Sequence, residues 1–489
     1  MHIIFVHTPM ATLPVPQRKR FWQGFDIRYH AAHPGLRHMK NNLWELPHWM
    51  HWLAGVLVDC GYTSIEAIDF YTAECALTGI NKTMVANVLR AHEADAYLFS
   101  PMTPNLPFAY EIADVIKELY PNSVTVFGGV VATPLCEEVA SHPSVDYVVS
   151  DRGEYALPAL LRALENGGEA IAEVGNLTYK RVDGQVVTNA HHYPYMPVHE
   201  IPFPKIDLFD PSVGEDIRYL RQVYALGCPY QCPFCTIQTI GRKASYFPIE
   251  RVLAEIRAYR TYYGEHHNIY FGDETFTLHS GRTLELLNAL KQEGNITYDC
   301  QTRLNCLNDT RVLQALRESG CRWIEIGIET ANQESSNIFK QRTKLSEVET
   351  TLARVRDAGL AACSFMVNGF PNQTLDDMKR SIEYICSLID TGLLQASYLF
   401  GLVPYPGSDM YEHPERYGIQ LLHRNFKYYH EEMPPVFRSA YAEPDEVYDV
   451  FLQGVASLAE IMNHSSNFTP AIAEEDLALY GTFWQDPHV

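Results

Sequence analysis

Short apolar runs alternate with helical patterns along the first part of this 489-residue chain. Strand-like runs fall at residues 3–7, 64–70, 96–100 and 123–127, and helix-like patterns fall at residues 53–60, 109–119 and 157–164. Strands and helices that alternate at this spacing favour a parallel sheet with helices on both faces. Ligands bind such a sheet beyond the carboxyl ends of its strands. The pattern predicts a doubly wound α/β domain over residues 1–185.

A domain boundary follows this first alternation. Residues 176–188 predict a hairpin, and Asp183-Gly184 at its tip is typical of a type I′ turn. Prolines then recur over residues 186–218, a stretch that suits neither helix interiors nor ladder pairing. We expect this stretch to be an ordered linker between two domains.

A second alternation of strands and helices covers residues 219–411. Eight strand–helix units need more residues than this interval offers, so we expect an open, six-stranded partial barrel. Barrel enzymes place their chemistry at the carboxyl ends of such strands. Residues 412–489 include an amphipathic pattern near residues 446–462 and are predicted to form a helical cap.

Composition narrows the class of protein. Hydrophobic residues make up 46% of the chain and charged residues 20%, which is typical of a globular protein. The formal net charge of −21 argues against nucleic acid as a partner, because phosphate binding needs a basic surface. No apolar run approaches a membrane span and no leader pattern opens the chain, so we expect a cytoplasmic protein without a membrane partner.

Three of the eleven cysteines form a tight run. Cys228, Cys232 and Cys235 are spaced C-x3-C-x2-C within Gly-Cys-Pro-Tyr-Gln-Cys-Pro-Phe-Cys. Thiolates suit iron–sulfur clusters, and three of them leave one iron of a four-iron cluster without a protein ligand. A zinc site is the alternative, but zinc sites usually bring two CxxC pairs or histidines at set spacing. The spacing favours a [4Fe–4S] cluster whose open iron binds a small molecule.

This cysteine run, with Phe234 directly before its last member, resembles the signature of the radical S-adenosylmethionine (SAM) enzymes. The resemblance implies that SAM chelates the open iron through its amine and carboxylate. One electron, from an external reductant such as flavodoxin or ferredoxin, then yields a 5′-deoxyadenosyl radical that acts on a small-molecule substrate.

The resemblance extends through residues 219–411 and implies a SAM site at the strand ends. Gly272, Asp273 and Glu274 take the place of the family's glycine-rich motif, which receives the amino group of SAM. Arg303 and Glu329 would contact SAM, and the backbone at Asn368 and Gly369 would approach its adenine. An alternative for Arg303 and Glu329 is an ion pair with each other inside the barrel mouth.

A second resemblance covers residues 1–185. The segments 100–105, 127–129 and 148–154 are similar to those of the cobalamin-binding domain that precedes many radical SAM domains. By this resemblance, the corrin and its nucleotide tail would be lined by Ser100, Thr103, Gly128 and Gly129. The D-x-H-x-x-G motif of classical cobalamin enzymes is absent, so we expect no histidine on cobalt. The resemblance leaves an empty domain open as the alternative.

Aromatic residues gather before residue 53. Four of the six tryptophans are among them, namely Trp22, Trp44, Trp49 and Trp52. Aromatic rings stack on flat ligands and also fill hydrophobic clusters. This segment therefore either covers a cofactor or substrate, or packs as a satellite core.

The two resemblances together favour cobalamin-dependent C-methylation of a small molecule, with SAM as radical source and as methyl donor by way of methylcobalamin. With the first domain empty, the radical would drive deoxygenation or rearrangement. Transfer of the 3-amino-3-carboxypropyl group of SAM is a third outcome. A non-catalytic cobalamin or iron–sulfur sensor is the alternative from a different class, and it would not need the SAM-site motifs.

Overall fold

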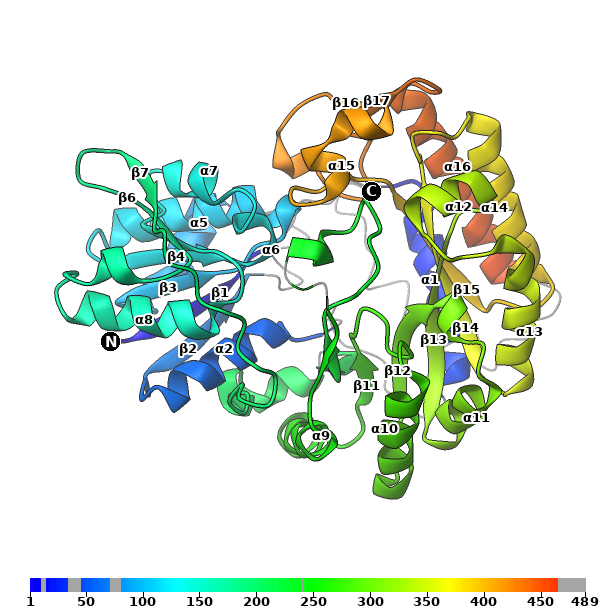
Figure 1. Ribbon diagram of the computed structural model, residues 1–489, viewed down its shortest axis with the longest axis horizontal. Helices are drawn as coiled ribbons and strands as arrows, with labels where there is room; N and C mark the ends of the chain where they lie inside the picture. Colours follow the sequence, from blue (N-terminus) through cyan, green and yellow to red (C-terminus); the bar gives the residue numbers. More distant parts are fainter. Residues whose placement is uncertain are drawn as a thin grey trace.

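The computed structural model describes residues 1–9, 15–33, 45–70, 81–215, 217–239, 241 and 243–464. Its two large sheets lie side by side, with the first at the N-terminal side and the second surrounded by helices (Figure 1). Among the described helices, no segment is both long and apolar enough to cross a membrane.

The first sheet has seven strands in the order β2-β1-β3-β4-β5-β6-β7. The strands are β1 (Ile3–His7), β2 (Ile65–Asp69), β3 (Ala96–Phe99), β4 (Val124–Gly128), β5 (Tyr147–Val149), β6 (Leu177–Lys180) and β7 (Val186–Thr188). The first five in chain order pair in parallel, and the β6–β7 hairpin adds an antiparallel edge. The expected doubly wound sheet is confirmed, and the pairing of β7 carries this sheet slightly past the predicted boundary at residue 185.

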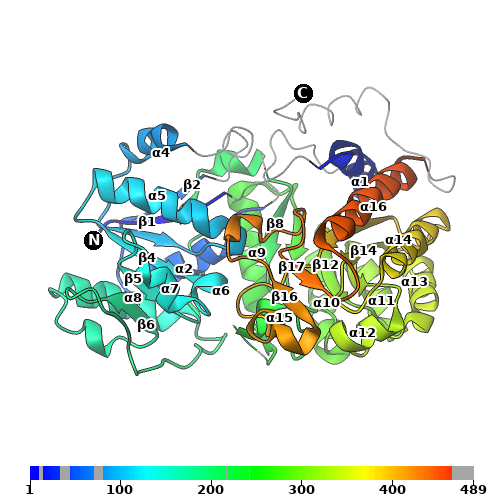
Figure 2. The same cartoon turned by 90° about the horizontal axis from the view of Figure 1, so that it is seen from above.

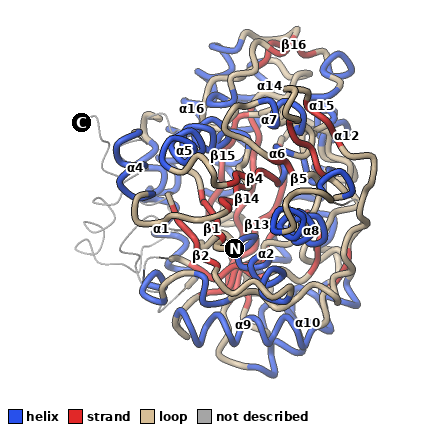
Figure 3. Tube along the Cα trace, turned by 90° about the vertical axis from the view of Figure 1, so that its left-hand side faces the viewer, coloured by secondary structure: helices blue, strands red, loops and turns tan. Residues whose placement is uncertain are grey.

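Helices cover both faces of this sheet. They are α2 (His48–Asp59), α4 (Lys82–Leu89), α5 (Leu106–Leu119), α6 (Gly129–Ala132), α7 (Cys136–Ser141) and α8 (Gly153–Glu165). Ile4 and Val6 of β1 pack in one core with α5, whereas Ile3 and Phe5 pack in another with α2 and α8. Figure 3 shows α5 and α8 on opposite sides of the strands. Alternate residues of a buried strand thus serve opposite faces.

The hairpin tip differs from the predicted type I′ turn. Gly184 has φ +86, but Asp183 is not among the residues with positive φ. A type I′ turn needs positive φ at both central residues. Instead, Gly184 N–H donates to the carbonyl of Arg181 at 2.9 Å, and the Arg181 N–H donates to the carbonyl of Gln185 at 2.8 Å. Only the glycine takes the left-handed conformation.

The second sheet is an open, parallel arrangement of six strands in the order β15-β14-β13-β12-β11-β8. Its strands are β8 (Tyr219–Gln222), β11 (Asn268–Phe271), β12 (Tyr298–Arg303), β13 (Cys321–Glu329), β14 (Ala361–Asn368) and β15 (Ala396–Gly401). The covering helices are α9 (Ile249–Tyr263), α10 (Ser280–Glu293), α11 (Thr310–Glu318), α12 (Gln333–Phe339), α13 (Val348–Asp357) and α14 (Leu375–Asp390). β8 and β15 form its two edges, as expected for a partial barrel.

Local sequence explains these helices. At the start of α14, the Thr374 side chain accepts from the Asp377 N–H, and the Asp377 carboxylate accepts from the Thr374 N–H. This capping box satisfies two backbone donors that a helix start leaves unpaired. The apolar side chains of Met378, Ile382 and Ile385 then recur at helical spacing and are buried.

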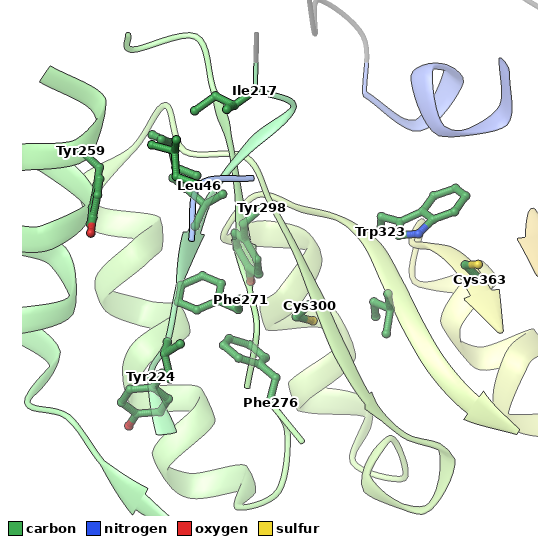
Figure 4. Packing of buried hydrophobic residues seen from close by; sticks show 14 of the residues in the cluster. Leu46, Ile217, Tyr224, Tyr259, Phe271, Phe276, Tyr298, Cys300, Trp323 and Cys363 are labelled. Atoms are coloured by element: carbon green, nitrogen blue, oxygen red, sulfur yellow. The ribbon is translucent and has the colours of Figure 1, made fainter. Parts of the chain in front are cut away.

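Helix α1 (Arg18–Ala32) follows β1 in the chain but packs against the partial barrel. It lies beside α16 (Pro444–His464) in Figure 2. Near the amino ends of the barrel strands, the Tyr29 hydroxyl donates to Asp299 Oδ2 at 2.5 Å, and His33 Nε2 lies 2.6 Å from Asp299 Oδ1. Trp323, which Figure 4 shows apart from the cluster around Phe271, contacts both Phe25 and Tyr29. Helix α1 therefore closes the bottom of the barrel.

The C-terminal cap bridges both domains. It contains α15 (Asp409–Glu412), β16 (Ile419–Leu421), β17 (Phe437–Ser439) and α16. Tyr429 and Phe426 join the hydrophobic core of the first sheet. Lys427 pairs with Glu111 of α5 at 2.9 Å. The cap thus fixes the first domain against the barrel as well as covering the barrel itself.

Candidate active site at the mouth of the barrel

The three clustered cysteines lie on a loop between β9 (Ala225–Leu226) and β10 (Ser245–Tyr246), which pair as a short antiparallel neck. Cys228 and Cys232 are buried, and Cys235 is partly buried. Burial raises the pKa of Cys235 to about 11, and the charges of Cys228 and Cys232 contribute to this rise. The three sulfurs therefore lie near one another, and iron would displace the proton of Cys235 on binding.

The cysteine loop fits a four-iron cluster. Among the described residues, no three histidine, cysteine or acidic side chains converge closely enough to hold a single metal ion. Such convergence is not needed here, because each cysteine of a cluster binds a different iron. Arg303 Nη1 donates to Cys232 Sγ at 3.2 Å, and Thr275 Oγ1 lies 3.8 Å from Cys228 Sγ. A hydrogen bond to a ligand sulfur, such as the one from Arg303, stabilises and tunes an iron–sulfur cluster. The Thr275 hydroxyl donates to the Glu274 carbonyl at 2.7 Å instead.

Arg303 closes the third barrel strand and joins three segments. Besides Cys232, its guanidinium donates to the carbonyls of Lys340 and Gln341. It also lies 3.8 Å from the ring centroid of Tyr230, which is on the cysteine loop. Arg303 thus holds the cysteine loop against the segment that follows α12, rather than pairing with Glu329.

Glu329 pairs with Lys340, which corrects the expected alternative of an Arg303–Glu329 ion pair. The Lys340 ammonium lies 2.5 Å from Glu329 Oε1, and both side chains are buried. A Cβ on Gly327 would collide with this ammonium. Lys340 follows α12 and carries no motif of its own, so only the way its loop folds back over the strand ends brings it here.

The two acidic residues after β11 have different surroundings. The Asp273 carboxylate accepts from the backbone N–H groups of Tyr224 at 3.0 Å and Ala225 at 2.5 Å, just before the cysteine loop. Burial raises the pKa of Asp273 to about 7. Burial also raises the pKa of Glu274, and no described side chain hydrogen-bonds to its carboxylate. The Glu274 carboxylate accepts from the Gly227 N–H but is partly exposed, whereas Asp273 is buried, so Glu274 is the member of the motif that can reach a ligand.

Gly272 lies against Arg221. A Cβ at Gly272 would stand 2.5 Å from the guanidinium of Arg221, which binds the Glu45 carboxylate through Nη1 at 2.8 and 2.9 Å. Burial raises the pKa of Glu274, and the charge of Arg221 opposes that rise. Because Gly272 has no side chain, the Arg221 guanidinium, paired with Glu45, can lie at the edge of the expected SAM site.

The residues expected near adenine lie at the end of β14. Asn368 Nδ2 donates to the carbonyl of Val447 at 3.1 Å, while its buried Oδ1 has no hydrogen-bond partner among the described residues. Gly369 has φ +96, and a Cβ there would meet Val447 at 3.0 Å. Phe234 packs 5.9 Å from Phe370 in a small aromatic cluster. The structure brings these residues to the same mouth as the cysteine loop.

The residues expected to bind cobalamin gather at the carboxyl ends of β3 and β4. Gly129 has φ +85, and a Cβ there would collide with Ser100 Oγ. Thr103 is buried, and the neighbouring Met102 is 53% exposed. Asn105 has a buried Oδ1 without a hydrogen-bond partner. An exposed apolar side chain beside an unpartnered polar atom fits a large ligand with both apolar and polar parts.

A histidine does lie at this edge. His7 ends β1, and its Nδ1 lies 2.9 Å from the carboxylate of Asp69 at the end of β2. The expectation that no histidine binds cobalt stays a prediction.

Loops of the first domain contact the cysteine loop. Arg152, after β5, places Nη2 3.2 Å from where a Cβ of Gly241 would be. Gly407, after β15, similarly faces both Pro134, which follows α6, and Thr239 on the cysteine loop. The strand-end edges of the two sheets therefore meet. The sequence did not predict these contacts of Arg152 and Gly407, because a contact between domains leaves no local pattern.

The tryptophans of the early segment pack in cores. Trp22 contacts Phe25 and Tyr398, and Trp49 packs on Phe5 in the middle of β1. Neither ring lies at the strand ends of the first sheet, and Trp44 falls outside the described residues. For Trp22 and Trp49 the structure agrees with the alternative of hydrophobic packing.

This fold and site define a two-domain α/β enzyme in which an open cysteine cluster faces the ligand edge of a second sheet. The family model described as the radical SAM superfamily matches residues 223–385, and the model described as the B12 binding domain matches residues 46–161. The chain is a radical SAM enzyme with an N-terminal B12-binding domain. Its cofactors are those expected from the sequence: a [4Fe–4S] cluster, SAM and cobalamin.

Two curated relatives illustrate the range of similar proteins. An uncharacterized methyltransferase from Pyrococcus horikoshii is 28% identical over 351 residues, which cover 71% of this chain and 74% of the relative. An anaerobic magnesium-protoporphyrin IX monomethyl ester cyclase from Rubrivivax gelatinosus is 24% identical over 386 residues, which cover 75% of this chain and 66% of the relative.

Two solved structures share the fold. The radical SAM methyltransferase TsrM from Kitasatospora setae, with cobalamin and a [4Fe–4S] cluster bound, has a TM-score of 0.69 at 14% identity, covering 98% of this chain and 95% of that one. The cobalamin-dependent radical SAM enzyme OxsB, with aqua-cobalamin and SAM bound, has a TM-score of 0.66 at 18% identity. The match covers 92% of this chain and 65% of that one. At these identities the likeness concerns the fold.

Proposed function

We propose that this enzyme methylates a carbon atom of a small molecule, using SAM both as radical source and as methyl donor. The observation that carries the proposal is the meeting of the two strand-end edges, where Arg152 reaches Gly241 and Gly407 faces Pro134. Reagents held at these two edges would share one reaction space. The names of relatives, which include bacteriochlorophyllide and hopanoid methylases as well as the Pyrococcus protein, support the same chemistry.

In this proposal the cysteine loop holds the cluster and the strand ends hold SAM. When bound, the cluster with SAM supplies a 5′-deoxyadenosyl radical, and cobalamin supplies the methyl group. Glu274 accepts the amino group of SAM, since Asp273 is committed to backbone N–H groups. Arg303 keeps the loop in place, and the Glu329–Lys340 pair presents hydrogen-bonding groups near the same mouth.

The first domain would hold cobalamin at the ends of β3 and β4. Ser100 and Thr103 supply hydroxyls, and Gly128 and Gly129 let the chain turn without side chains at that edge. Met102 offers an exposed apolar contact for the macrocycle. An external one-electron donor such as flavodoxin or ferredoxin would reduce the cluster.

The test needs no knowledge of the substrate. Protein reconstituted anaerobically with iron, sulfide and hydroxocobalamin is mixed with SAM and a chemical reductant, and S-adenosylhomocysteine and 5′-deoxyadenosine are quantified. We expect both products, and we expect S-adenosylhomocysteine to disappear when cobalamin is left out. 5′-Deoxyadenosine alone, with corrin bound, would favour radical rearrangement or deoxygenation. Release of methylthioadenosine would favour 3-amino-3-carboxypropyl transfer.

A further inference from the structure

Partly exposed side chains alternate with buried ones along strands of the partial barrel. Along β8 the partly exposed residues are Tyr219 and Arg221, and their neighbours in the strand are buried. In β14 and β15 the same alternation leaves Phe365, Tyr398 and Phe400 partly exposed. Helices cover the outer faces, so the exposed members of each alternation line the inside of the barrel.

Aromatic rings form two walls of this interior. Tyr219 of β8 stacks on Tyr270 of β11, with ring centroids 4.9 Å apart. Across the sheet, Tyr398 stacks on Phe365 at 5.3 Å and on Phe400 at 5.7 Å. The faces of aromatic rings carry partial negative charge and attract cations.

A carboxyl group connects the two walls. Glu325 of β13 accepts from the Tyr270 hydroxyl at 2.8 Å and from the Tyr398 hydroxyl at 3.2 Å. Burial raises the pKa of Glu325 to about 7, and the charges of Asp299 and Glu45 contribute. An ionised carboxylate has about four acceptor positions, so two hydroxyl donors leave room for a further donor.

The charges around Glu325 favour a positive ligand. Three cations around the barrel have acidic partners: Arg221 binds Glu45, Arg218 binds Asp26, and Lys340 binds Glu329. A fourth, Arg303, donates to Cys232 and to two backbone carbonyls. No described cation lies within salt-bridge distance of Glu325. A buried carboxyl without a cationic partner is costly unless it is protonated or meets a positive group.

We propose that the barrel interior binds a substrate carrying a protonated amine, with Glu325 as its counter-ion and the aromatic walls around it. This inference rests on the proposed function only in taking the bound molecule as the substrate. A carboxylate flanked by aromatic faces combines ion pairing with cation–π attraction, which is the chemistry that recognises ammonium groups. Glu325 is then the residue that determines this specificity.

Two probes of equal shape test the proposal. Binding of 2-phenylethylamine and of its neutral counterpart 2-phenylethanol to the reconstituted holoenzyme is measured by ligand-observed NMR. We expect the amine to bind about tenfold or more tightly than the alcohol, since a partly desolvated charge pair is worth roughly that much. Equal binding of the two probes, or binding of neither, would overturn the proposal.

Variants test which residues cause the preference for the amine. Glu325→Gln keeps the size of the side chain and should abolish the preference for the amine, whereas Glu383→Gln, at an exposed position on α14, should retain it. Phe400→Leu removes one ring and should weaken binding of the amine several-fold. A preference that survives Glu325→Gln would contradict the assignment. Formation of S-adenosylhomocysteine without substrate in the same samples reports on the proposed function separately, so each idea can fail alone.

Discussion

Arg303 donates a hydrogen bond to the sulfur of Cys232 while its guanidinium lies over the ring of Tyr230. One side chain from a barrel strand thus contacts two residues of the cysteine loop, one of them a predicted cluster ligand. This placement adds to the role that the sequence suggested, since Arg303 contacts the cysteine loop as well as ending the strand at which SAM is expected.

Replacing Arg303 should change the cluster itself. Arg303→Met removes a charge-assisted donor to a ligand sulfur, and hydrogen bonds to sulfur set the reduction potential of such clusters. We expect a more negative potential in an anaerobic redox titration followed by EPR, together with weaker SAM binding. Arg311→Met, at an exposed arginine, is the control. An unchanged potential in Arg303→Met would show that this contact has no electronic effect.

The buried Glu329–Lys340 pair should be sensitive to loss of either partner. Lys340→Met leaves an unpaired carboxylate inside the barrel mouth, and breaking a buried pair in this way costs about 3 kcal/mol or more. The combined Glu329→Gln/Lys340→Met variant should lose less stability than the two single changes added together. Thermal unfolding of the wild type, the two single variants and the double variant completes a double-mutant cycle. Strict additivity would mean that the pair does not couple.

Gly129 should tolerate no side chain, whereas Gly128 should tolerate a small one. Gly129→Ala combines a positive φ with a collision against Ser100 Oγ, so we expect a loss of more than about 1 kcal/mol. Gly128 is extended at φ −158, and its Cβ would lie 3.1 Å from the Val149 carbonyl oxygen. Denaturant unfolding compares the two variants. Recovery of part of the loss in Ser100→Gly/Gly129→Ala would confirm the collision, and equal stability of Gly128→Ala and Gly129→Ala would refute it.

Glu325 should make stability fall as pH rises. Its pKa is raised from 4.5 to about 7 in the folded protein, so the folded state holds a proton that the unfolded chain has released between these values. The stability that Glu325 contributes is therefore present below pH 4.5 and declines up to about pH 7, by at most about 3 kcal/mol. Burial is the largest cause of this rise in pKa; the hydrogen bonds from Tyr270 and Tyr398 oppose it, and the charges of Asp299 and Glu45 add to it. The difference in unfolding free energy between wild type and Glu325→Gln, followed across this range, should show the decline. A flat difference would contradict it.

The sequence predicts what depends on local pattern. The strand–helix alternation gave both sheets, and the cysteine spacing placed Cys228, Cys232 and Cys235 on one loop at the barrel mouth. Local patterns did not predict the long-range contacts. Helix α1 follows the first strand of the first sheet, so it was expected in that domain, yet its Tyr29 bonds Asp299, 270 positions away.

Lys340 illustrates the same limit on a smaller scale. Its ammonium reaches Glu329 because Gly327 leaves the space above the strand empty. Neither an isolated lysine after a short helix nor a glycine within a strand predicts an ion pair. Such a pair depends on how a loop folds back, which periodicity does not encode.

In the proposed reaction, one chain holds a site-differentiated cluster and a corrin that act on the same substrate. The most direct measurement quantifies iron, corrin and SAM-derived products in one anaerobically reconstituted sample, beside Cys232→Ala as the matched variant. We expect about four iron atoms and about one corrin per chain, with cobalamin-dependent S-adenosylhomocysteine and with 5′-deoxyadenosine that is absent from Cys232→Ala. A wild-type protein that retains no corrin, or a Cys232→Ala protein that still cleaves SAM to 5′-deoxyadenosine, would contradict the account.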